Sequence, residues 1–412
     1  MTKHADRALA ERIGDGTKEA SACPVCACIE HVPFFDLAEV PVEEGILFDT
    51  RESARSCPVG EIRLSYCPAC GHIWNRAYRS GLVRFDERYD ISMHYSKLYG
   101  KFIDALASRL VSAYGLYHKT ILEIGCGKGE FLRQLVRIGR NRGIGFDPSY
   151  AGGAECEERD EAVSFVAEHF TGQHVGADAD FICCRHVLDD LENPLGFVSL
   201  VAKVSESDKP IVMYFEVPNG LYTFRDVNVW NIAYANYSYF TPRSLASLFS
   251  RCQMEVLSVA PCFEDDQYLG IEARLDPRQQ GAFAWSVENE SHIILEQLRT
   301  FSSVYHRKLM AWQEELETLA RTGQKVIAWG GGVRAISFLS RLQIKEQIEY
   351  VVDINPNKQG KFLPLTGQEV VGPEFVRDYR PDVVFITNNT FTAEIRQQVA
   401  EMGVSCQFKE LV

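Results

Sequence analysis

The sequence has no apolar run long enough to cross a membrane. No window of its 412 residues reaches the roughly 18 to 20 consecutive apolar residues that a membrane-spanning helix needs. The N-terminal stretch MTKHADRALAERIGDG also lacks the apolar core of a secretory signal. We therefore expect a cytoplasmic protein with no membrane partner.

Basic residues are too few for a surface that binds nucleic acid. Lys and Arg number 43 against 56 Asp and Glu, so the formal net charge is −13. Because binding to a phosphate backbone depends on neutralising it with Lys and Arg, this balance argues against a nucleic-acid partner. Hydrophobic residues at 46% and charged residues at 24% are typical of folded proteins, and the length allows two or three domains.

What the sequence does have is cysteine, concentrated near its start. Six of the 13 cysteines lie within residues 1–80, and four of them form two CxxC pairs, Cys23 with Cys26 and Cys67 with Cys70. In a reducing compartment such pairs indicate metal binding before disulfides. Four thiolates complete a zinc ion's coordination and leave no position for chemistry. We predict a structural zinc at these four cysteines, with two unrelated thiol pairs as the alternative.

Apolar runs divide the rest of the chain into three segments. Residues 81–287 alternate β-branched and aromatic runs with helical segments, and residues 323–412 repeat this pattern, which predicts parallel sheets covered by helices. Residues 288–322 contain no Gly or Pro and have apolar residues at helical spacing, so we expect one linking helix. The runs predicted as strands are KTILEIG, RGIGFDPS, ADFICCRHV and PIVMYFEVP, then QKVIAW, QIEYVVD, GQEVVG and PDVVFITNN.

A glycine-rich loop after the first of these strands carries the clearest functional signal. The strand ends near Glu123, and Gly125, Gly127 and Gly129 follow before a helix, where a ligand can lie against the backbone. Asp147 ends the next strand, where a carboxylate accepts both ribose hydroxyls of a nucleoside. Since ExGxGxG differs from the GxGxxG of dinucleotide folds, we predict that these five residues bind S-adenosylmethionine (SAM). A loop with only a structural role is the alternative.

Two later segments are expected to border the same cleft. The loop after ADFICCRHV carries His186, a candidate general base because a neutral imidazole accepts a proton near pH 7. A hydrogen-bonded loop histidine is an equally good interpretation. The strand that ends in FEVPN brings Glu216 and Asn219 toward the cleft, or uses them to cap the turn.

A second glycine-rich loop lies in the last segment. Gly330, Gly331 and Gly332 follow a strand and open a helix, and Asp353 ends the next strand. Taken alone, this pattern indicates a dinucleotide site, so an NAD-dependent oxidoreductase is an alternative function. Arg334, at the start of that helix, is placed to hold a diphosphate.

The order of these parts resembles one family, the SAM-dependent C-methyltransferases of nucleotide-activated deoxysugars. The resemblance rests on CPACGHIWN, the ExGxGxG core, FEVPN followed by YSYFTPRSL, and VIAWGGGVRAISFL with the segments after it, and covers nearly the whole chain. It implies a class I methyltransferase α/β fold (Rossmann-like), an N-terminal zinc-binding domain and a second, C-terminal Rossmann-like α/β domain. It also implies a nucleotide-sugar substrate, in natural-product or surface-polysaccharide biosynthesis, and removal of a proton next to a ketone before methyl transfer.

The chain departs from this family where the acid–base pair is expected. Family members look like Tyr-Glu-His there, whereas this chain has Tyr234, Ala235 and Asn236. Neither Ala nor an amide titrates near neutrality, so neither can take the proton. Either the acceptor is an oxygen or nitrogen atom, whose methylation needs less help, or the base has moved. A SAM-binding scaffold or regulator without activity and a methyltransferase of another small molecule are further alternatives.

The resemblance and the residue types together give a set of candidates for the acceptor's side of the site. The catalytic candidates are Tyr89, His186, Tyr234 and Asn236, with His94 and Tyr95 as other titratable groups nearby. The substrate-binding candidates are Glu216, Asn219, Tyr239, Arg334 and Asp353.

Overall fold

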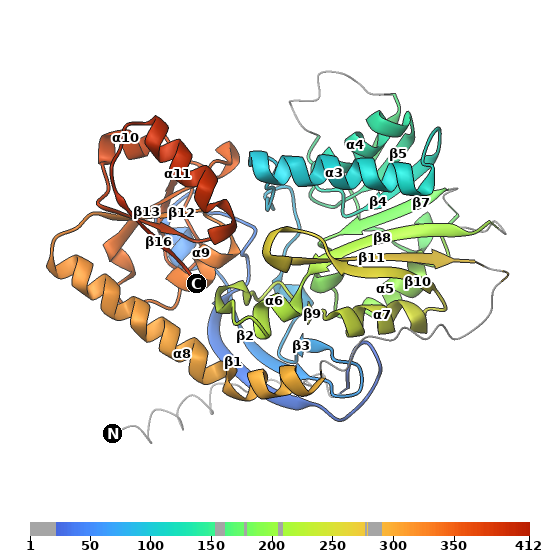
Figure 1. The fold of residues 1–412 in the computed structure, drawn as a ribbon, viewed down its shortest axis with the longest axis horizontal. Coiled ribbons are helices and arrows are strands. Elements are labelled where there is room, and N and C mark those ends of the chain that lie inside the picture. Colours follow the sequence, from blue (N-terminus) through green and yellow to red (C-terminus); the bar gives the residue numbers. More distant parts are fainter. Residues whose placement is uncertain (1–21, 153–160, 177–178, 205–208, 277, 279–290) are drawn as a thin grey trace.

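The described part of the chain forms three sheets, shorter helices that pack around them, and one long helix (Figure 1). A computed structural model describes residues 22–152, 161–176, 179–204, 209–276, 278 and 291–412. Residues 1–21 of the expected zinc domain and residues 288–290 of the expected linking helix lie outside this part of the chain. None of the helices it contains is both long and apolar enough to span a membrane.

The first sheet is antiparallel and belongs mainly to the cysteine-rich segment. Its strands are β1 (Val32–Pro41), β2 (Val59–Tyr66), β3 (Ile73–Asn75) and β9 (Ser238–Tyr239), in that order across the sheet. The short helix α2 (Arg51–Arg55) lies between β1 and β2 in the chain. Strand β9 comes from the middle of the chain and pairs with β3. The first sheet therefore contains residues of the expected second domain.

The central sheet has seven strands in the order β10-β11-β8-β7-β4-β5-β6. In chain order they are β4 (Thr120–Ile124), β5 (Arg142–Phe146), β6 (Val163–Val166), β7 (Phe181–Arg185), β8 (Ile211–Pro218), β10 (Glu255–Pro261) and β11 (Tyr268–Leu275). The four runs predicted in this segment are confirmed as β4, β5, β7 and β8, and they are parallel. Strand β11 is antiparallel to both β8 and β10, which the hydrophobic pattern did not predict.

Helices cover both faces of the central sheet (Figure 1). They are α3 (Lys97–Tyr114) and α4 (Glu130–Gly139) on one face, and α5 (Pro194–Val201), α6 (Gly220–Phe224) and α7 (Pro242–Arg251) on the other side. Ile121 and Phe181 pack in one core with α3 and α4, whereas their neighbours Leu122 and Ile182 pack in a second core with α5 and α7. Burial on both faces explains why β4 and β7 are continuous apolar runs.

The third sheet is parallel throughout and forms the C-terminal domain. Its order is β14-β13-β12-β15-β16, with β12 (Val326–Trp329), β13 (Ile348–Val352), β14 (Glu369–Val371), β15 (Val383–Ile386) and β16 (Gln407–Glu410). Its helices are α9 (Val333–Leu339), α10 (Phe375–Tyr379) and α11 (Thr392–Glu401). The four predicted runs are confirmed as β12 to β15. The α/β class predicted for both segments is therefore confirmed.

One long helix, α8 (Ser291–Arg321), occupies the segment predicted to link the two α/β domains. It ends just before Gly323, whose φ of +67° suits glycine. The helix also packs on the first sheet, since the Phe301 and Tyr305 rings lie 5.2 and 4.9 Å from that of Phe35. Figure 1 shows it running from the first sheet to the C-terminal domain. The helix thus holds three parts of the molecule together.

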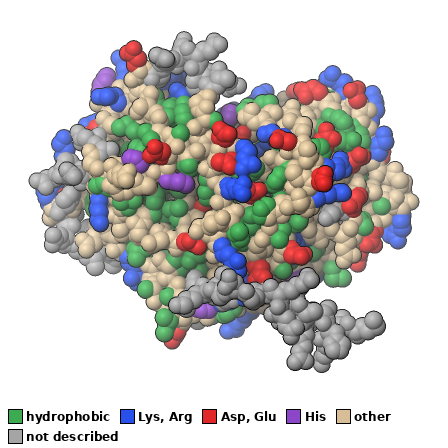
Figure 2. All heavy atoms as spheres, turned by 180° about the vertical axis from the view of Figure 1, so that it is seen from behind, with side chains coloured by type: hydrophobic (Ala, Val, Ile, Leu, Met, Phe, Trp, Pro, Cys, Tyr) green, Lys and Arg blue, Asp and Glu red, His purple; other side chains and the backbone are tan. Residues whose placement is uncertain are grey.

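The outer surface carries mixed charge. On the face shown in Figure 2, Lys and Arg side chains are interspersed with Asp and Glu side chains. This pattern agrees with a sequence that contains 43 basic and 56 acidic residues.

Candidate active site

A cavity of about 950 Å³ lies between the central sheet and the C-terminal domain. On one side it is lined by residues at the carboxyl ends of β4 and β5, among them Gly127 and Asp147. On the other side it is lined by the loop after β12, among them Gly330 and Arg334. Ligands of α/β sheets bind at the carboxyl ends of the strands. Both predicted glycine loops therefore open onto the same space.

The first loop needs its glycines for two different reasons. Gly125, Gly127 and Gly129 all have a positive φ, at +74°, +55° and +87°. A Cβ on Gly125 would lie 2.0 Å from Val187 Cγ2, and one on Gly129 would lie 2.3 Å from Phe165 Cζ. A Cβ on Gly127 would meet nothing within 4 Å. Gly127 thus borders open cavity, while Gly129 is the N-cap residue of α4 and is not among the lining residues.

Two carboxyl groups flank this loop as predicted. Asp147 Oδ2 accepts the Gly127 N–H at 2.8 Å, and its Oδ1 accepts the Ser149 N–H at 2.7 Å. Glu123 is only 2% exposed, and burial raises its pKa to about 8 although Arg185 lowers it. Glu123 Oε2 is buried and has no hydrogen-bond partner among the described residues. An unpartnered oxygen and a carboxylate beside an open glycine fit the polar groups of SAM.

Arg185 and His186, at the end of β7, both contact the buried carboxylate of Glu216. Arg185 Nη2 donates to Glu216 Oε1 at 2.7 Å, His186 Nε2 lies 3.0 Å from the same oxygen, and the Tyr214 hydroxyl donates to Oε2. Burial alone would raise the pKa of Glu216, but Arg185 and His186 hold it well below its usual range. The His186 ring also meets Tyr268 edge-on at 4.5 Å. The His186 backbone N–H also donates to the Glu216 carbonyl at 2.8 Å, so Glu216 helps to hold His186 at the cavity wall.

The structure places three of the four catalytic candidates at the cavity. Tyr89, His186 and Asn236 line it. Tyr234 does not: it is fully buried, its hydroxyl accepts the Arg79 N–H at 3.1 Å, and its ring stacks on another tyrosine. Its sequence position two residues before Asn236 gave no sign of this, because the chain bends at Tyr234 and Ala235.

The substrate-binding candidates divide in the same way. Arg334 and Asp353 line the cavity, whereas Glu216, Asn219 and Tyr239 do not. Asn219 caps α6 and donates from Nδ2 to the Asp266 carbonyl, as the capping alternative expected. The Tyr239 hydroxyl donates to the Ala233 carbonyl inside the core. These two side chains stabilise the walls of the site.

Arg334 extends from the second residue of α9 across to the central domain. Its Nε donates to Asn231 Oδ1 at 2.7 Å, its Nη2 to Gln267 Oε1 at 2.7 Å, and its Nη1 to Asn388 Oδ1 at 2.8 Å. The Tyr222 hydroxyl accepts a further bond at 3.1 Å. Within the described chain no carboxylate oxygen comes within 4.0 Å of this guanidinium. Its partners are far apart in the sequence, so no local motif could have indicated them.

The carboxylate of the second glycine loop already has a cationic partner. Asp353 Oδ2 accepts the Gly331 N–H at 2.8 Å and lies 3.5 Å from Lys358 Nζ. Both side chains are largely buried, at 11% and 12% exposure. A carboxylate paired in this way is a poor acceptor for ribose hydroxyls. The geometry therefore disfavours the dinucleotide-binding alternative at this loop.

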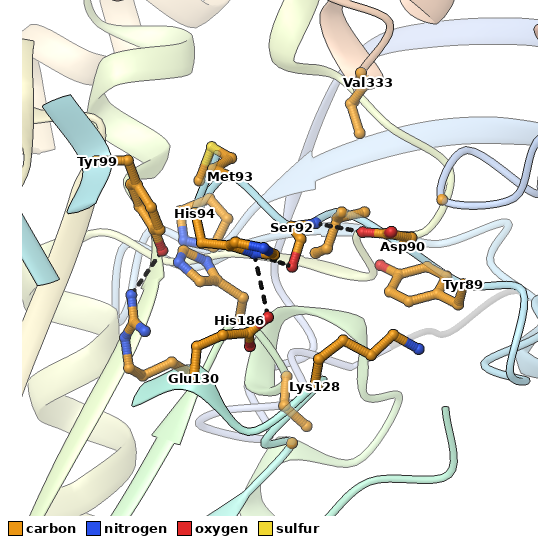
Figure 3. A pocket seen from close by; sticks show the side chains of 18 of the residues that line it. Tyr89, Asp90, Ser92, Met93, His94, Tyr99, Lys128, Glu130, His186 and Val333 are labelled. Carbon is orange, nitrogen blue, oxygen red and sulfur yellow. Dashed lines mark hydrogen bonds and ion pairs between the residues drawn. The ribbon is translucent and has the colours of Figure 1, made fainter. Parts of the chain in front are cut away.

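The segment that precedes α3 covers part of the cavity (Figure 3). His94 Nδ1 lies 3.1 Å from both Ser92 Oγ and Glu130 Oε1, where Glu130 begins α4. The segment also contacts the C-terminal domain, because Ser96 Oγ donates to Glu394 Oε2 at 2.8 Å. The sequence placed His94 near the site but did not predict its contact with Glu130 of α4.

The four predicted zinc ligands come together in the first domain. Cys23 Sγ lies 3.6 Å from Cys70 Sγ, Cys26 Sγ lies 3.5 Å from Cys67 Sγ, and all four sulfurs are within 4.8 Å of one another. Zinc–sulfur bonds of about 2.3 Å at tetrahedral angles put sulfurs roughly 3.8 Å apart. The donor set therefore fits a closed zinc site, and none of the four cysteines lines the cavity.

Two protein families match consecutive parts of the chain. Residues 94–259 match the family described as a methyltransferase domain. Residues 271–406 match the family described as a C-methyltransferase C-terminal domain. A search of the curated proteins found no match.

Solved structures similar to this chain include several methyltransferases. One is a SAM-dependent methyltransferase from Aquifex aeolicus, with 15% identity, a TM-score of 0.34, and coverage of 41% of this chain and 88% of that chain. A second is the magnesium protoporphyrin IX methyltransferase of Synechocystis with bound S-adenosylhomocysteine, with 15% identity, a TM-score of 0.35, and coverage of 43% and 83%. A third is the 1,6-didemethyltoxoflavin N1-methyltransferase of Burkholderia thailandensis, with 16% identity, a TM-score of 0.33, and coverage of 43% and 80%.

Proposed function

We propose that this SAM-dependent methyltransferase transfers its methyl group to a carbon atom of a sugar carried by a nucleoside diphosphate. The observation that carries the proposal is the position of Arg334, a cation without an acidic partner on the wall of the cavity that the SAM loop also lines. The substrate is then held between the donor on the central sheet and the C-terminal domain.

The contacts of Arg334 favour an anionic ligand. Five hydrogen bonds from this guanidinium go to uncharged oxygens, so they orient it without neutralising its charge. These bonds use all five N–H groups of the side chain, so a phosphate would take the place of uncharged oxygens such as Asn389 Oδ1, which lies at 3.4 Å. The exchange is favourable because charge-assisted bonds from arginine to phosphate are among the strongest in proteins. In a nucleotide sugar, the diphosphate is the anionic group that can bind this guanidinium.

The size of the cavity supports two ligands. Its 950 Å³ is near the upper end of the range of about 300–1,000 Å³ found for ligand pockets. It is continuous from Gly127 to Arg334, so an acceptor bound at Arg334 can reach a donor bound at the first loop. A methyl transfer needs the two reacting atoms to be in contact, without water between them.

Carbon is the acceptor favoured by the match of residues 271–406 to a C-methyltransferase domain. Against it stand Ala235 and Asn236, which line the cavity and offer no titratable group. Methylation of an oxygen or nitrogen is therefore the competing outcome. NMR of the product distinguishes a new carbon-bound methyl from a methoxy or N-methyl group.

The test is calorimetric titration with S-adenosylhomocysteine, followed by thymidine, guanosine, uridine and cytidine diphosphate sugars. We expect one nucleotide to bind more tightly when S-adenosylhomocysteine is present, and Arg334→Gln to weaken nucleotide binding at least tenfold while donor affinity stays unchanged. Arg377→Gln is the matched control, because Arg377 is exposed on α10 of the same domain. Equal nucleotide affinity in wild type and Arg334→Gln would contradict the assignment of the diphosphate site.

We also propose that the four cysteines hold a structural zinc. Because a closed site of four thiolates contributes folding energy without chemistry, Cys67→Ser should lose zinc and lower thermal stability together. Metal analysis and calorimetric unfolding of the purified protein measure both. A stable Cys67→Ser protein with a full equivalent of zinc would contradict the site.

A further inference from the structure

The Tyr234–Asn236 segment reaches the cavity without a proton acceptor of its own. Ala235 and Asn236 line the cavity, and Tyr234 faces away from it. Removal of a carbon-bound proton requires a base within hydrogen-bond reach of the acceptor. The candidates are therefore the titratable groups of other elements that come close to this segment.

Glu44 meets this requirement from the first domain. It lies in the turn after β1, lines the cavity, and is only 3% exposed. Its Oε2 accepts the Ala235 N–H at 3.3 Å. Its Oε1 is buried and has no hydrogen-bond partner among the described residues. A buried carboxyl oxygen without a partner is costly, and a ligand in the cavity would satisfy it.

The turn that carries Glu44 is fixed against the cavity wall. The Tyr89 ring packs directly on Gly45, where a Cβ would lie 2.1 Å from Tyr89 Cε2. The Asp90 N–H donates to the Gly45 carbonyl at 2.9 Å. Glycine at position 45 therefore lets Tyr89 and Glu44 lie side by side at the acceptor end of the cavity. A substrate ketone between them can have its carbonyl oriented by Tyr89 and the proton on its neighbouring carbon removed by Glu44.

We propose that Glu44 is the general base of this enzyme and replaces the acid–base pair that Ala235 and Asn236 lack; the inference rests on the proposed function. The proton on the acceptor atom moves to Glu44 Oε1, and the electron pair left behind attacks the methyl carbon of SAM. The sulfur–methyl bond breaks with its electrons remaining on sulfur. The carboxylate and the sulfonium thus become a neutral carboxylic acid and the neutral thioether of S-adenosylhomocysteine.

The electrostatic surroundings of Glu44 suit a base. Burial raises the pKa of Glu44 to about 8, and the backbone N–H groups of Ala235 and Tyr234 and the charge of Arg341 limit the rise. The other titratable groups that interact with Glu44 across the packed elements are Tyr89, Asp190 and Tyr239. A carboxylate with a raised pKa is a stronger proton acceptor than an exposed glutamate.

Asp189 is the main competitor for this role. It follows His186 in the loop after β7, lines the cavity, and also has a buried oxygen, Oδ1, without a partner. Burial raises its pKa to about 6, and His186 lowers it. Unlike Glu44, Asp189 has no hydrogen bond to the Tyr234–Asn236 segment among the contacts described. The two carboxyl groups are separated by experiment below.

The first experiment uses nucleoside diphosphate sugars that carry a ketone. In D₂O, with S-adenosylhomocysteine in place of SAM, NMR follows exchange of the proton next to the ketone, and a parallel assay follows methyl transfer from SAM. Glu44→Gln should slow both reactions at least about 100-fold without changing S-adenosylhomocysteine affinity. Asp189→Asn should retain the exchange reaction. Exchange that survives in Glu44→Gln and is lost in Asp189→Asn would overturn the proposal.

Glu43→Gln is the matched control for this experiment. Glu43 is the adjacent residue, is also buried, and lies 3.5 Å from Arg84 Nε, but it is not among the cavity-lining residues. We expect Glu43→Gln to leave both reactions unchanged. A loss equal to that of Glu44→Gln would mean that the turn, and not the Glu44 carboxyl, is responsible.

A second measurement needs no substrate. Dicyclohexylcarbodiimide modifies protonated carboxyl groups in apolar cavities, so mass spectrometry should find Glu44 labelled at pH 7, less above pH 8, and protected by bound ligands. An unlabelled Glu44 beside a labelled Asp189 would overturn the proposal whichever acceptor is found. If Glu44 is labelled but no nucleotide sugar is methylated or exchanged, the substrate assignment fails while Glu44 keeps its support.

Discussion

In the central domain Asp147 accepts the N–H of Gly127, and in the C-terminal domain Asp353 accepts the N–H of Gly331, both at 2.8 Å. Each aspartate follows the strand after its glycine loop, so the two domains repeat one strand–loop–helix–strand arrangement. The contact is the same, but its surroundings differ. Asp147 has no basic side chain within 4.0 Å among the described residues, whereas Asp353 is paired with Lys358.

The glycines differ in what lies in front of them. A Cβ on Gly127 would meet nothing within 4 Å, while one on Gly331 would lie 3.2 Å from Asp353 Oδ2. An open backbone and a carboxylate without a basic partner fit the nucleoside site expected at the first loop. In the second domain the same backbone instead positions Arg334 at the cavity. The comparison shows that the glycine pattern specifies the backbone conformation of the loop. The side chains around the loop then decide whether a nucleotide can bind there.

Blocking the open face of the first loop should have the largest effect. Gly127→Val places a branched side chain in the cavity at a backbone φ of +55°, so we expect S-adenosylhomocysteine affinity to fall more than about 1,000-fold. Calorimetric titration measures it. Gly332→Ala is the control in the second loop, since its φ is −100° and its Cβ would meet nothing within 4 Å. Equal donor affinity in the two variants would mean that the first loop does not hold SAM.

The two domains also differ at the residue two positions before the glycine loop, and this difference should make protein stability depend on pH. Glu123 in β4 corresponds to Ala328 in β12, and burial raises the pKa of Glu123 to about 8 from an ordinary value of 4.5. The native state therefore keeps a proton that the unfolded chain loses, so stability falls as pH rises from about 4.5 to 8.

Glu123→Gln removes this dependence. Relative to the wild type, the variant should be more stable above pH 8, by about 5 kcal/mol at most, and the difference should vanish near pH 4.5. Urea unfolding at a series of pH values without ligand measures it. A difference between the proteins that stays constant with pH would show that Glu123 is ionised in the native state.

Neutralising the two aspartates tests whether only one of them binds the donor. Asp147→Asn loses a charged acceptor for ribose hydroxyls, so we expect S-adenosylhomocysteine affinity to fall about 10- to 100-fold. Asp353→Asn should leave it within about twofold, because Asp353 already serves Gly331 and Lys358. The measurement is again calorimetric. A comparable loss in Asp353→Asn would mean that the second loop is a donor site as well.

The smallest effect is expected from Lys358→Met. This substitution removes the cation beside Asp353, which has no counterpart beside Asp147 among the described residues. The ion pair with Asp353 spans 3.5 Å in a largely buried position, so its loss should cost about 1 to 2 kcal/mol of unfolding free energy. Asp353 keeps the N–H bonds of Gly331 and Asn355, which limits the cost. Thermal unfolding measures it, and a stability gain would show that the pair is strained.

The strands and their parallel order could be predicted because a strand that is buried on both faces has a continuous run of apolar residues. β4 and β7 are apolar throughout, and the glycine loop and Asp147 mark where β4 and β5 end. The antiparallel strand β11 has no such run, since Tyr268–Leu275 mixes Gly, Glu and Arg with apolar residues. The cysteine cluster was predicted correctly because the CxxC spacing itself places two sulfurs on one turn.

The acceptor's side of the site was harder to predict because its residues are brought together only by packing of the domains. Glu44 and Ala235 are separated by most of two domains and still share a hydrogen bond. Tyr239 and Asn219 looked like substrate contacts from the family pattern, but they bond to the backbone of the core and of the α6 cap. A local motif identifies residue types, and it does not tell which way a side chain points.

The pairing of β9 with β3 has a consequence for how the protein is made. The first sheet is complete only when Ser238 and Tyr239 join it, although its other strands end at Asn75. During synthesis the N-terminal sheet must therefore wait, with the β3 edge uncovered, until the ribosome has produced most of the central domain. A gene fragment cut at residue 80 should accordingly give an aggregation-prone product, and an intact chain should assemble these two domains in a single folding event.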